Sequence, residues 1–287
     1  MSAKAAFLAD RAVLRVEGAD RLSFLQGLLT NDVESLAEGE ARFAGLLSPQ
    51  GKILFDFFVI AVGESLFLDC PGIIAADLLK RLTFYRLRAS VTIADVSEAY
   101  RVAAAWDEGA LDLAKANAAI AYADPRLPAL GVRALAGKPD AAALPNAFED
   151  YEAMRIALAI PEGGKDYAYG DAFPHDACFD LLNGVSFKKG CFVGQEVVSR
   201  MEHRGTARTR VLAVSAGQPL PQGGADIMAD GFAVGRLGSA AGSRGVALAR
   251  LDRVRDALAK GQALTVGGVA IEAAAPGWAS YSLDPAA

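Results

Sequence analysis

The stretch after Gly205 constrains the fold of this chain more than any other feature. It is a series of short strand candidates separated by glycines, with two-residue hairpin signals at Asp230-Gly231 and Gly267-Gly268. One short helix is expected at 252–260, closing on Gly261. The strand candidates are 208–214, 226–228, 232–237, 245–251, 263–266 and 269–273. Short strands joined by tight turns are typical of a small antiparallel β-barrel.

The preceding part of the chain alternates between strand and helix patterns. A strand is expected at 12–17, and Asp20 is placed to cap a helix that ends near Asn31. The turn residues of Ser48-Pro49-Gln50-Gly51-Lys52 separate two apolar runs and predict a hairpin. The remaining expected elements are strands at 41–47, 53–62, 66–70, 89–95, 100–106, 118–123 and 130–135, and helices at 72–84 and 146–159. We therefore expect an α+β region, 1–205, composed of two subdomains, and a barrel domain, 206–287.

Length and composition fit a two-domain protein outside the membrane. The chain has 287 residues, enough for a substantial core. No uninterrupted apolar run approaches the 18 or so residues of a membrane span, so no membrane partner is expected. The first residues resemble neither a secretory signal nor an Arg/Ser-rich transit peptide. These features favour a cytoplasmic location.

The cysteines do not form a ligand framework. There are three of them, Cys70, Cys178 and Cys191, and no two are in C-x-x-C spacing. This pattern argues against a disulfide scaffold and against a self-contained zinc or iron–sulfur site. His175 and His203 could add ligands from a distance, but no intrinsic metal site is expected. Cys70 and Cys178 are expected to be buried packing residues.

The residues around Cys191 have the features that activate a thiol. Lys188 and Lys189 precede the cysteine, and a helix is expected to follow it from Gly194. Both cations and a helix N-terminus lower the pKa of a thiol. On that helix Glu196 and Arg200 are spaced for an i,i+4 ion pair, and Gly205 lies at the C′ position. A cysteine in a loop can equally serve only packing, and the residues alone leave both interpretations open.

Charge is concentrated in the same region. Between Lys188 and Arg210 there are six basic and two acidic residues, a local balance of +4 in a chain of net charge −5. A basic patch in an acidic protein favours a localised anionic ligand, whereas nucleic-acid binding would favour a basic domain overall. A solvated helix face would also explain such a run. We expect no direct nucleic-acid partner.

Four stretches of the chain form motifs. The most specific is Lys189-Gly190-Cys191-Phe192-Val193-Gly194-Gln195-Glu196, followed by Arg200. The others are Phe24-Leu25-Gln26-Gly27-Leu28 with Thr30-Asn31-Asp32-Val33, then Pro49-Gln50-Gly51-Lys52, and finally Arg204-Gly205. These stretches resemble the YgfZ family, which consists of folate-binding proteins of iron–sulfur cluster assembly and repair. The resemblance covers nearly the whole chain, and the family is similar in fold to the glycine-cleavage T-protein.

The resemblance implies a T-protein-like body of mixed or antiparallel sheets with helices, which binds tetrahydrofolate and supports iron–sulfur enzymes, including tRNA-modifying ones. Its partners would be iron–sulfur assembly factors and client enzymes. Cys191 is the expected chemical group. Residues expected to shape its loop are Lys189, Gly190, Gly194, Gln195, Glu196 and Arg200. Residues expected to contact folate are Asn31, Arg155, Tyr169, Asp176, Arg204 and Arg208. Asp176 stands where the family has a glutamate, so its carboxylate is one methylene shorter.

Two other functions remain open from the sequence. A folate-dependent aminomethyltransferase has two consecutive aspartates after the hairpin, whereas this chain has Phe55-Asp56. A phenyl ring cannot accept a proton, so Asp56 would have to act alone. A scaffold that binds folate and partner proteins without any reaction is the other alternative. We expect an accessory factor more than a conventional enzyme.

Overall fold

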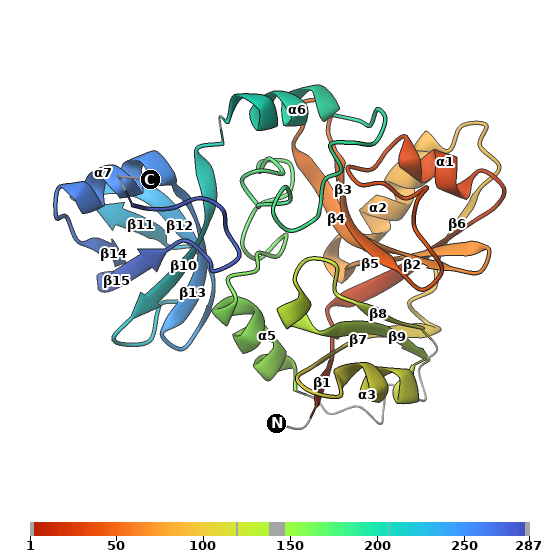
Figure 1. The fold of residues 1–287 in the computed structure, drawn as a ribbon, viewed down its shortest axis with the longest axis horizontal. Coiled ribbons are helices and arrows are strands. Elements are labelled where there is room, and N and C mark those ends of the chain that lie inside the picture. The colour runs from red at the N-terminus through yellow and green to blue at the C-terminus, as the bar shows by residue number, and fades with distance from the viewer. Residues whose placement is uncertain (1–2, 119, 138–146, 206, 285–287) are drawn as a thin grey trace. The chain divides into compact units, whose positions relative to one another are not determined.

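The computed structural model describes residues 3–118, 120–137, 147–205 and 207–284, and Figure 1 draws its fold. These residues fall into two compact units. Unit 1 comprises Met1–Tyr151 and Leu182–Gln195, and unit 2 comprises Glu152–Leu181 and Glu196–Ala287. The division differs from a single boundary between 205 and 206, because the segment 152–181 belongs to the same unit as the barrel. Residue 206 itself lies outside the described residues.

A five-stranded antiparallel sheet forms one half of unit 1. Its order is β3 (Ala41–Leu47), β4 (Ile53–Val62), β5 (Ser65–Pro71), β2 (Arg11–Glu17) and β6 (Thr92–Asp95). The β3–β4 hairpin has the strand limits that the sequence predicts, because apolar runs stop at a Pro-Gln-Gly turn. Helix α2 (Gly72–Tyr85) buries Leu78 and Leu82 and contacts β2, β5 and β6.

A four-stranded sheet forms the other half of unit 1. Its order is β1 (Lys4–Phe7), β7 (Tyr100–Trp106), β9 (Val132–Gly137) and β8 (Ile120–Ala123), with a short 3₁₀ turn at Pro128–Leu130. Helix α3 (Ala110–Asn117) contacts all four strands. Neither β1 nor α3 was expected from the sequence. Strand β1 has only four residues, two of them alanine, which favours strands weakly, and α3 has only eight residues. The predicted strand 118–123 begins at 120 in the structure, and residue 119 lies outside the described residues.

Helix α1 (Arg21–Gln26) is shorter than the sequence predicts. It stops before Leu29, because Leu29 forms a bridge with Leu46 and the Thr30 N–H donates to the Gly45 carbonyl at 3.0 Å. Asp20 does not cap this helix through its side chain, which instead accepts the Ser90 N–H at 2.7 Å. Pairing with β3 therefore outweighs helix propensity here.

A buried ionic cluster within unit 1 joins its two sheets. Asp69 on β5 is fully buried and accepts Arg11 Nε at 2.6 Å on one carboxylate oxygen. Its other oxygen accepts Arg133 Nη2 from β9 at 2.7 Å and the Tyr122 hydroxyl from β8 at 2.9 Å. Burial raises the pKa of Asp69, but Arg11 and Arg133 outweigh that effect and hold the pKa below its ordinary value. The carboxylate is thus charged and locks the sheets together.

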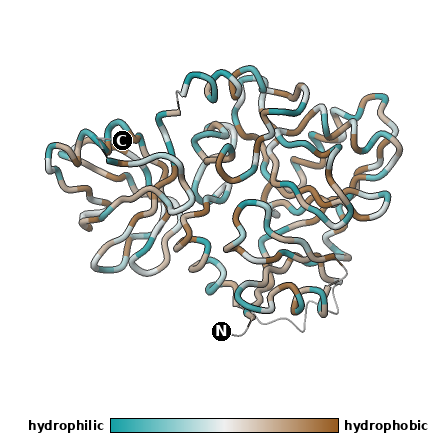
Figure 2. Tube along the Cα trace, in the orientation of Figure 1, coloured by the Kyte–Doolittle hydropathy of each residue, from teal (hydrophilic) through white to brown (hydrophobic). Residues whose placement is uncertain are grey.

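Unit 2 contains a closed six-stranded antiparallel barrel, as predicted. The order around it is β10 (Thr209–Ala216), β13 (Arg244–Arg250), β12 (Phe232–Ala241), β11 (Asp226–Ala229), β14 (Leu264–Val266) and β15 (Val269–Ala274). Leu212, Leu237, Val254 and Val266 belong to its core, with Val254 contributed by α7 (Leu251–Ala259). Hydrophobic residues lie along many of these strands (Figure 2).

The chain passes between the units at three points, and two of these points lie within helices. Helix α5 (Phe148–Ala157) agrees with the predicted helix, whose expected start at 146 lies outside the described residues. Helix α6 (Gln195–Arg204) follows Cys191 and ends before Gly205, whose φ of +57° fits the predicted C′ position. None of the helices in the described ranges has the length and apolar character needed to cross a bilayer.

Candidate functional site: the cysteine segment

The cysteine segment, residues 183–194, lies entirely in unit 1 and is tied to the stretch Thr30-Asn31. The Thr30 hydroxyl donates to the Gly184 carbonyl at 2.6 Å, and the Ser186 N–H donates to the Thr30 carbonyl at 2.9 Å. Asn31 donates from its amide to the carbonyl of Asn183 at 2.7 Å. The start of the segment is therefore fixed by two neighbouring polar residues.

Lys189 anchors the middle of the segment. Its ammonium donates to the carbonyls of Gln26 and Leu29, both at 2.6 Å, and to that of Asn31 at 3.1 Å. These carbonyls lie at and just after the end of α1, where backbone acceptors have no helical partner. Burial lowers the pKa of Lys189 to about 8, although nearby acidic side chains oppose the shift. The ammonium also lies 5.4 Å from the centre of the Phe192 ring.

Gly194 anchors the end of the segment against the β3–β4 hairpin. Its φ is +82°, and a Cβ at this position would lie 2.6 Å from the Ser48 carbonyl oxygen and 3.0 Å from Gly51 Cα. Only glycine fits such a close approach in this backbone conformation. Gly190 is different, because a Cβ there would meet nothing within 4 Å and its φ is not positive. Gly190 therefore neither adopts a left-handed backbone conformation nor makes a close approach.

Cys191 is exposed between these two anchors. The next residue, Phe192, is buried. The other two cysteines are fully buried, as expected. Burial raises the pKa of Cys70 to about 12 and also raises the pKa of Cys178. Cys191 is thus the thiol that solvent and other proteins can reach.

Helix α6 begins immediately after the segment. The Gln195 N–H donates to the Phe192 carbonyl at 3.2 Å, which closes the turn into the helix. Arg200 donates to the carboxylate of Glu196, and both side chains are largely exposed, so the predicted i,i+4 pair is present. An exposed pair of this kind contributes little stability.

Two residues expected to contact folate are engaged within the protein instead. All five N–H donors of the fully buried Arg155 guanidinium have protein acceptors. Those acceptors are Glu152, Asp166, Ser239 and the carbonyl of Ile160. Both amide hydrogens of Asn31 are also used, by the carbonyls of Phe43 and Asn183. In this conformation neither residue has a donor left for a pteridine or a glutamate tail.

The other expected folate residues are more accessible. Arg204 and Arg208 are exposed, and Tyr169 is half-buried with its ring packed edge-on against Tyr167. Asp176 is half-buried and accepts the Phe173 N–H at 2.9 Å. The donor chemistry of the two arginines suits a carboxylate ligand. Four of the six residues expected to contact tetrahydrofolate are therefore exposed or half-buried, whereas Asn31 and Arg155 are used within the protein.

Asp56, the candidate transferase carboxylate, is buried on β4. It is 4% exposed and lies opposite Gly45 in the β3–β4 register. Its neighbours Phe55 and Phe57 are also buried. A general base must reach the atom that it deprotonates, and burial of this degree restricts such access.

Sequence reasoning missed two groups of polar residues. Thr30 is one, since its hydroxyl bridges β3 and the cysteine segment, and only its place in a motif stretch hinted at this role. The other is His175 with Asp180 and Glu202, whose side chains converge in unit 2. The spacing of these three residues in the sequence matches no metal-binding motif, so the sequence did not indicate the cluster.

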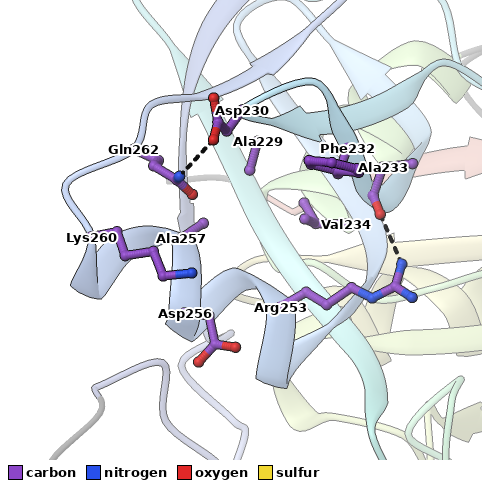
Figure 3. A pocket seen from close by; sticks show the side chains of 10 residues that line it. All are labelled: Ala229, Asp230, Phe232, Ala233, Val234, Arg253, Asp256, Ala257, Lys260 and Gln262. Carbon is purple, nitrogen blue, oxygen red and sulfur yellow. Dashed lines mark hydrogen bonds between the residues drawn. The ribbon is translucent and has the colours of Figure 1, made fainter.

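A surface groove on the barrel contains none of the expected site residues. Its volume is about 480 Å³, and it lies between the β11–β12 turn and α7. Figure 3 shows Asp230 accepting a hydrogen bond from Gln262, and Arg253 donating to the Ala233 carbonyl beside the exposed ring of Phe232. The motif residues therefore define the cysteine segment, and not this groove, as the candidate site.

Fold and domain content define the class of protein. Residues 9–118 match the GCVT N-terminal domain, and residues 208–281 match the C-terminal beta-barrel domain of CAF17. The crystal structure of the glycine cleavage system aminomethyltransferase T from Bartonella henselae superposes with a TM-score of 0.71 at 15% identity, over 94% of this chain and 84% of that one. The chain therefore has the T-protein-like fold followed by a β-barrel.

Sequence relatives identify the family. The mitochondrial iron-sulfur cluster assembly factor IBA57 of Homo sapiens is 33% identical over 300 residues, covering 94% of this chain and 84% of that protein. The protein of the same name from Mus musculus is 31% identical over 281 residues, covering 88% and 78%. The chain belongs to the CAF17/IBA57 family. Its relatives are named as mitochondrial, which contradicts the cytoplasmic location expected from the sequence.

Proposed function

We propose that this chain is an accessory factor that binds tetrahydrofolate and supports assembly or repair of iron–sulfur clusters in client enzymes, including tRNA-modifying ones. In this proposal Cys191 provides a transient thiolate ligand or redox group. The observation that carries it is the exposed sulfur of Cys191, held between the Lys189 and Gly194 anchors. The names of its relatives as iron–sulfur cluster assembly factors support the same role.

The geometry supports a sulfur that works by contact with another protein. A loop that is fixed at both sides keeps its exposed residue in one place, so little ordering is required when a partner or a cluster arrives. Thiolate sulfur is the usual protein ligand of iron–sulfur clusters. Iron–sulfur assembly factors and client enzymes are accordingly the proposed partners.

The folate part of the proposal rests on the motif resemblance and on the match to the GCVT N-terminal domain. Tyr169, Asp176, Arg204 and Arg208 remain the proposed contacts. Arg155 and Asn31 have a structural role instead, since their donors are used within the protein.

The experiment has two arms that separate binding from function. In the first, tetrahydrofolate is titrated into the purified chain and into Cys191→Ser, and we expect equal affinity. In the second, iron–sulfur client activity is measured in cells that carry either version, and we expect loss only with Cys191→Ser. A scaffold without chemistry predicts normal client activity for Cys191→Ser, and that result would refute the role of the thiol.

The aminomethyltransferase alternative makes a different demand. It requires folate-dependent turnover of a methylene donor, stopped by Asp56→Asn. The burial of Asp56 gives this alternative no support, and the similarity to aminomethyltransferase T concerns the fold alone.

A further inference from the structure

Three potential metal ligands converge in unit 2. A ring nitrogen of His175, a carboxylate oxygen of Asp180 and a carboxylate oxygen of Glu202 all lie within 4.8 Å of one another. His175 Nε2 and Glu202 Oε2 are already 3.1 Å apart. Bonds of about 2.0–2.2 Å to one ion would place three such donors roughly 3–4 Å apart, so only a small contraction is needed.

The burial of the three side chains is graded. His175 is 1% exposed and Asp180 is 8% exposed, whereas Glu202 on α6 is 42% exposed. An ion could therefore enter from the side of Glu202 while the other two ligands stay in place. Glu202 also has the rotational freedom to close the remaining distance.

Arg210 fixes the position of Asp180 through a hydrogen bond. It donates to Asp180 Oδ1 at 2.7 Å and to the His175 carbonyl at 2.8 Å, and its guanidinium lies 5.5 Å from the centre of the Tyr281 ring. A partner that fixes one carboxylate oxygen leaves the other available, which is how second-shell groups orient metal ligands. With a neutral histidine, the charges of Asp180, Glu202 and Arg210 sum to −1, which favours a cation.

The backbone between His175 and Asp180 is unusually constrained. Cys178 is fully buried and has a φ of +56°, a conformation that costs free energy for a residue other than glycine. Its N–H donates to the His175 carbonyl at 3.0 Å, so the turn brings the two ligand residues together. Strain of this kind persists where the surrounding structure requires one geometry.

From this geometry we propose that His175, Asp180 and Glu202 form a binding site for a divalent first-row transition-metal ion. One imidazole nitrogen and two carboxylate oxygens suit Zn²⁺, Fe²⁺ or Mn²⁺, and three protein ligands leave room for water. The inference does not depend on the proposed function, because it concerns other residues and a different ligand.

The test is a titration of the full chain with Zn²⁺ after metal removal, followed by calorimetry, with Co²⁺ absorption as a second measurement. All samples carry Cys191→Ser, which removes the exposed thiol as a competing ligand. We expect one equivalent to bind, and Glu202→Gln and Asp180→Asn each to weaken binding by about tenfold or more. The matched control is His203→Gln, which removes the exposed histidine next to Glu202 and should leave the affinity unchanged.

Glu202→Gln is the decisive variant, because its half-exposed side chain can change without disturbing the core. Its fold is checked by comparing its Tm with that of the parent. The inference is overturned if the parent binds no Zn²⁺, if Glu202→Gln binds as tightly as the parent, or if His203→Gln loses as much affinity.

Discussion

Gly194 lies against Ser48 so closely that a Cβ on the glycine would be 2.6 Å from the Ser48 carbonyl oxygen. This contact joins the end of the cysteine segment to the β3–β4 hairpin. Together with the Lys189 anchor it brings three motif stretches of the sequence to one place in unit 1. Cys191 is the exposed residue between the two anchors.

Gly194→Ala should destabilise the protein. The left-handed conformation and the clash with backbone atoms together should cost about 2–3 kcal/mol in the free energy of unfolding. Gly190→Ala is the matched control, since it lies in the same segment and has open space around it, and it should change stability by less than about 0.5 kcal/mol. Denaturant unfolding measures both, and equal effects of the two variants would show that the contact with Ser48 is unimportant.

Lys189→Met should loosen the cysteine segment. The change leaves three carbonyls without their common donor, which should cost about 1–3 kcal/mol when they stay buried. Hydrogen exchange of the amides at 186–194 should accelerate. Lys188→Met removes the neighbouring exposed lysine and should leave the exchange unchanged. If both lysine variants exchange alike, the anchoring role of Lys189 is wrong.

Iodoacetamide should modify one cysteine per native chain. Cys191 is exposed, whereas Cys70 and Cys178 are buried and have raised pKa values, which suppress the reactive thiolate. Peptide mass spectrometry should therefore locate the label at Cys191, and denaturant should release the other two. Early labelling of Cys178 in the native chain would contradict the burial described above.

Asp69→Asn should destabilise unit 1 strongly, because Arg11 and Arg133 would keep their charges without the shared carboxylate. Removing one member of a buried ion pair typically costs about 3–5 kcal/mol. Asp77→Asn, on the exposed face of α2, should cost less than about 0.5 kcal/mol.

The Asp69 carboxylate also makes the free energy of unfolding depend on pH, and its lowered pKa fixes the direction of that dependence. The folded-state pKa of Asp69 is below the ordinary value of 3.8, so the folded protein holds fewer protons than the unfolded chain in that range. Its stabilisation is present above pH 3.8 and disappears as the pH falls through the folded-state pKa. The stability difference between the parent and Asp69→Asn should therefore shrink in acid. A difference that stays constant down to the acid transition would contradict this assignment.

The elements with strong local signals were predictable from the sequence. The β3–β4 hairpin and the C-terminal strands have apolar runs bounded by turn residues, and the structure confirms them. The end of α1 was not predictable, because it depends on the pairing of Leu29 with Leu46. Local propensity favours a longer helix, and the tertiary contact outweighs it.

The candidate site shows the same division. The sequence indicated Cys191 and its neighbours, but not what those neighbours contact. The sequence shows Lys189 only as a cation near a thiol. In the structure its ammonium donates to a carbonyl 160 positions earlier in the chain. The sequence predicts that Arg155 contacts a ligand, whereas in the structure all of its guanidinium donors bind acceptors within the protein. Such contacts between distant segments follow from packing, which periodicity and spacing do not reveal.

The most direct test of the account is the specific activity of iron–sulfur client enzymes in cells whose only copy of this gene carries Cys191→Ser, relative to the amount of client protein. Tm and tetrahydrofolate affinity of the variant should match those of the parent, which separates the thiol from folding and folate binding. We expect client activity to fall to the level of cells that lack the protein. Full client activity with Cys191→Ser would show that this exposed sulfur is not the working group.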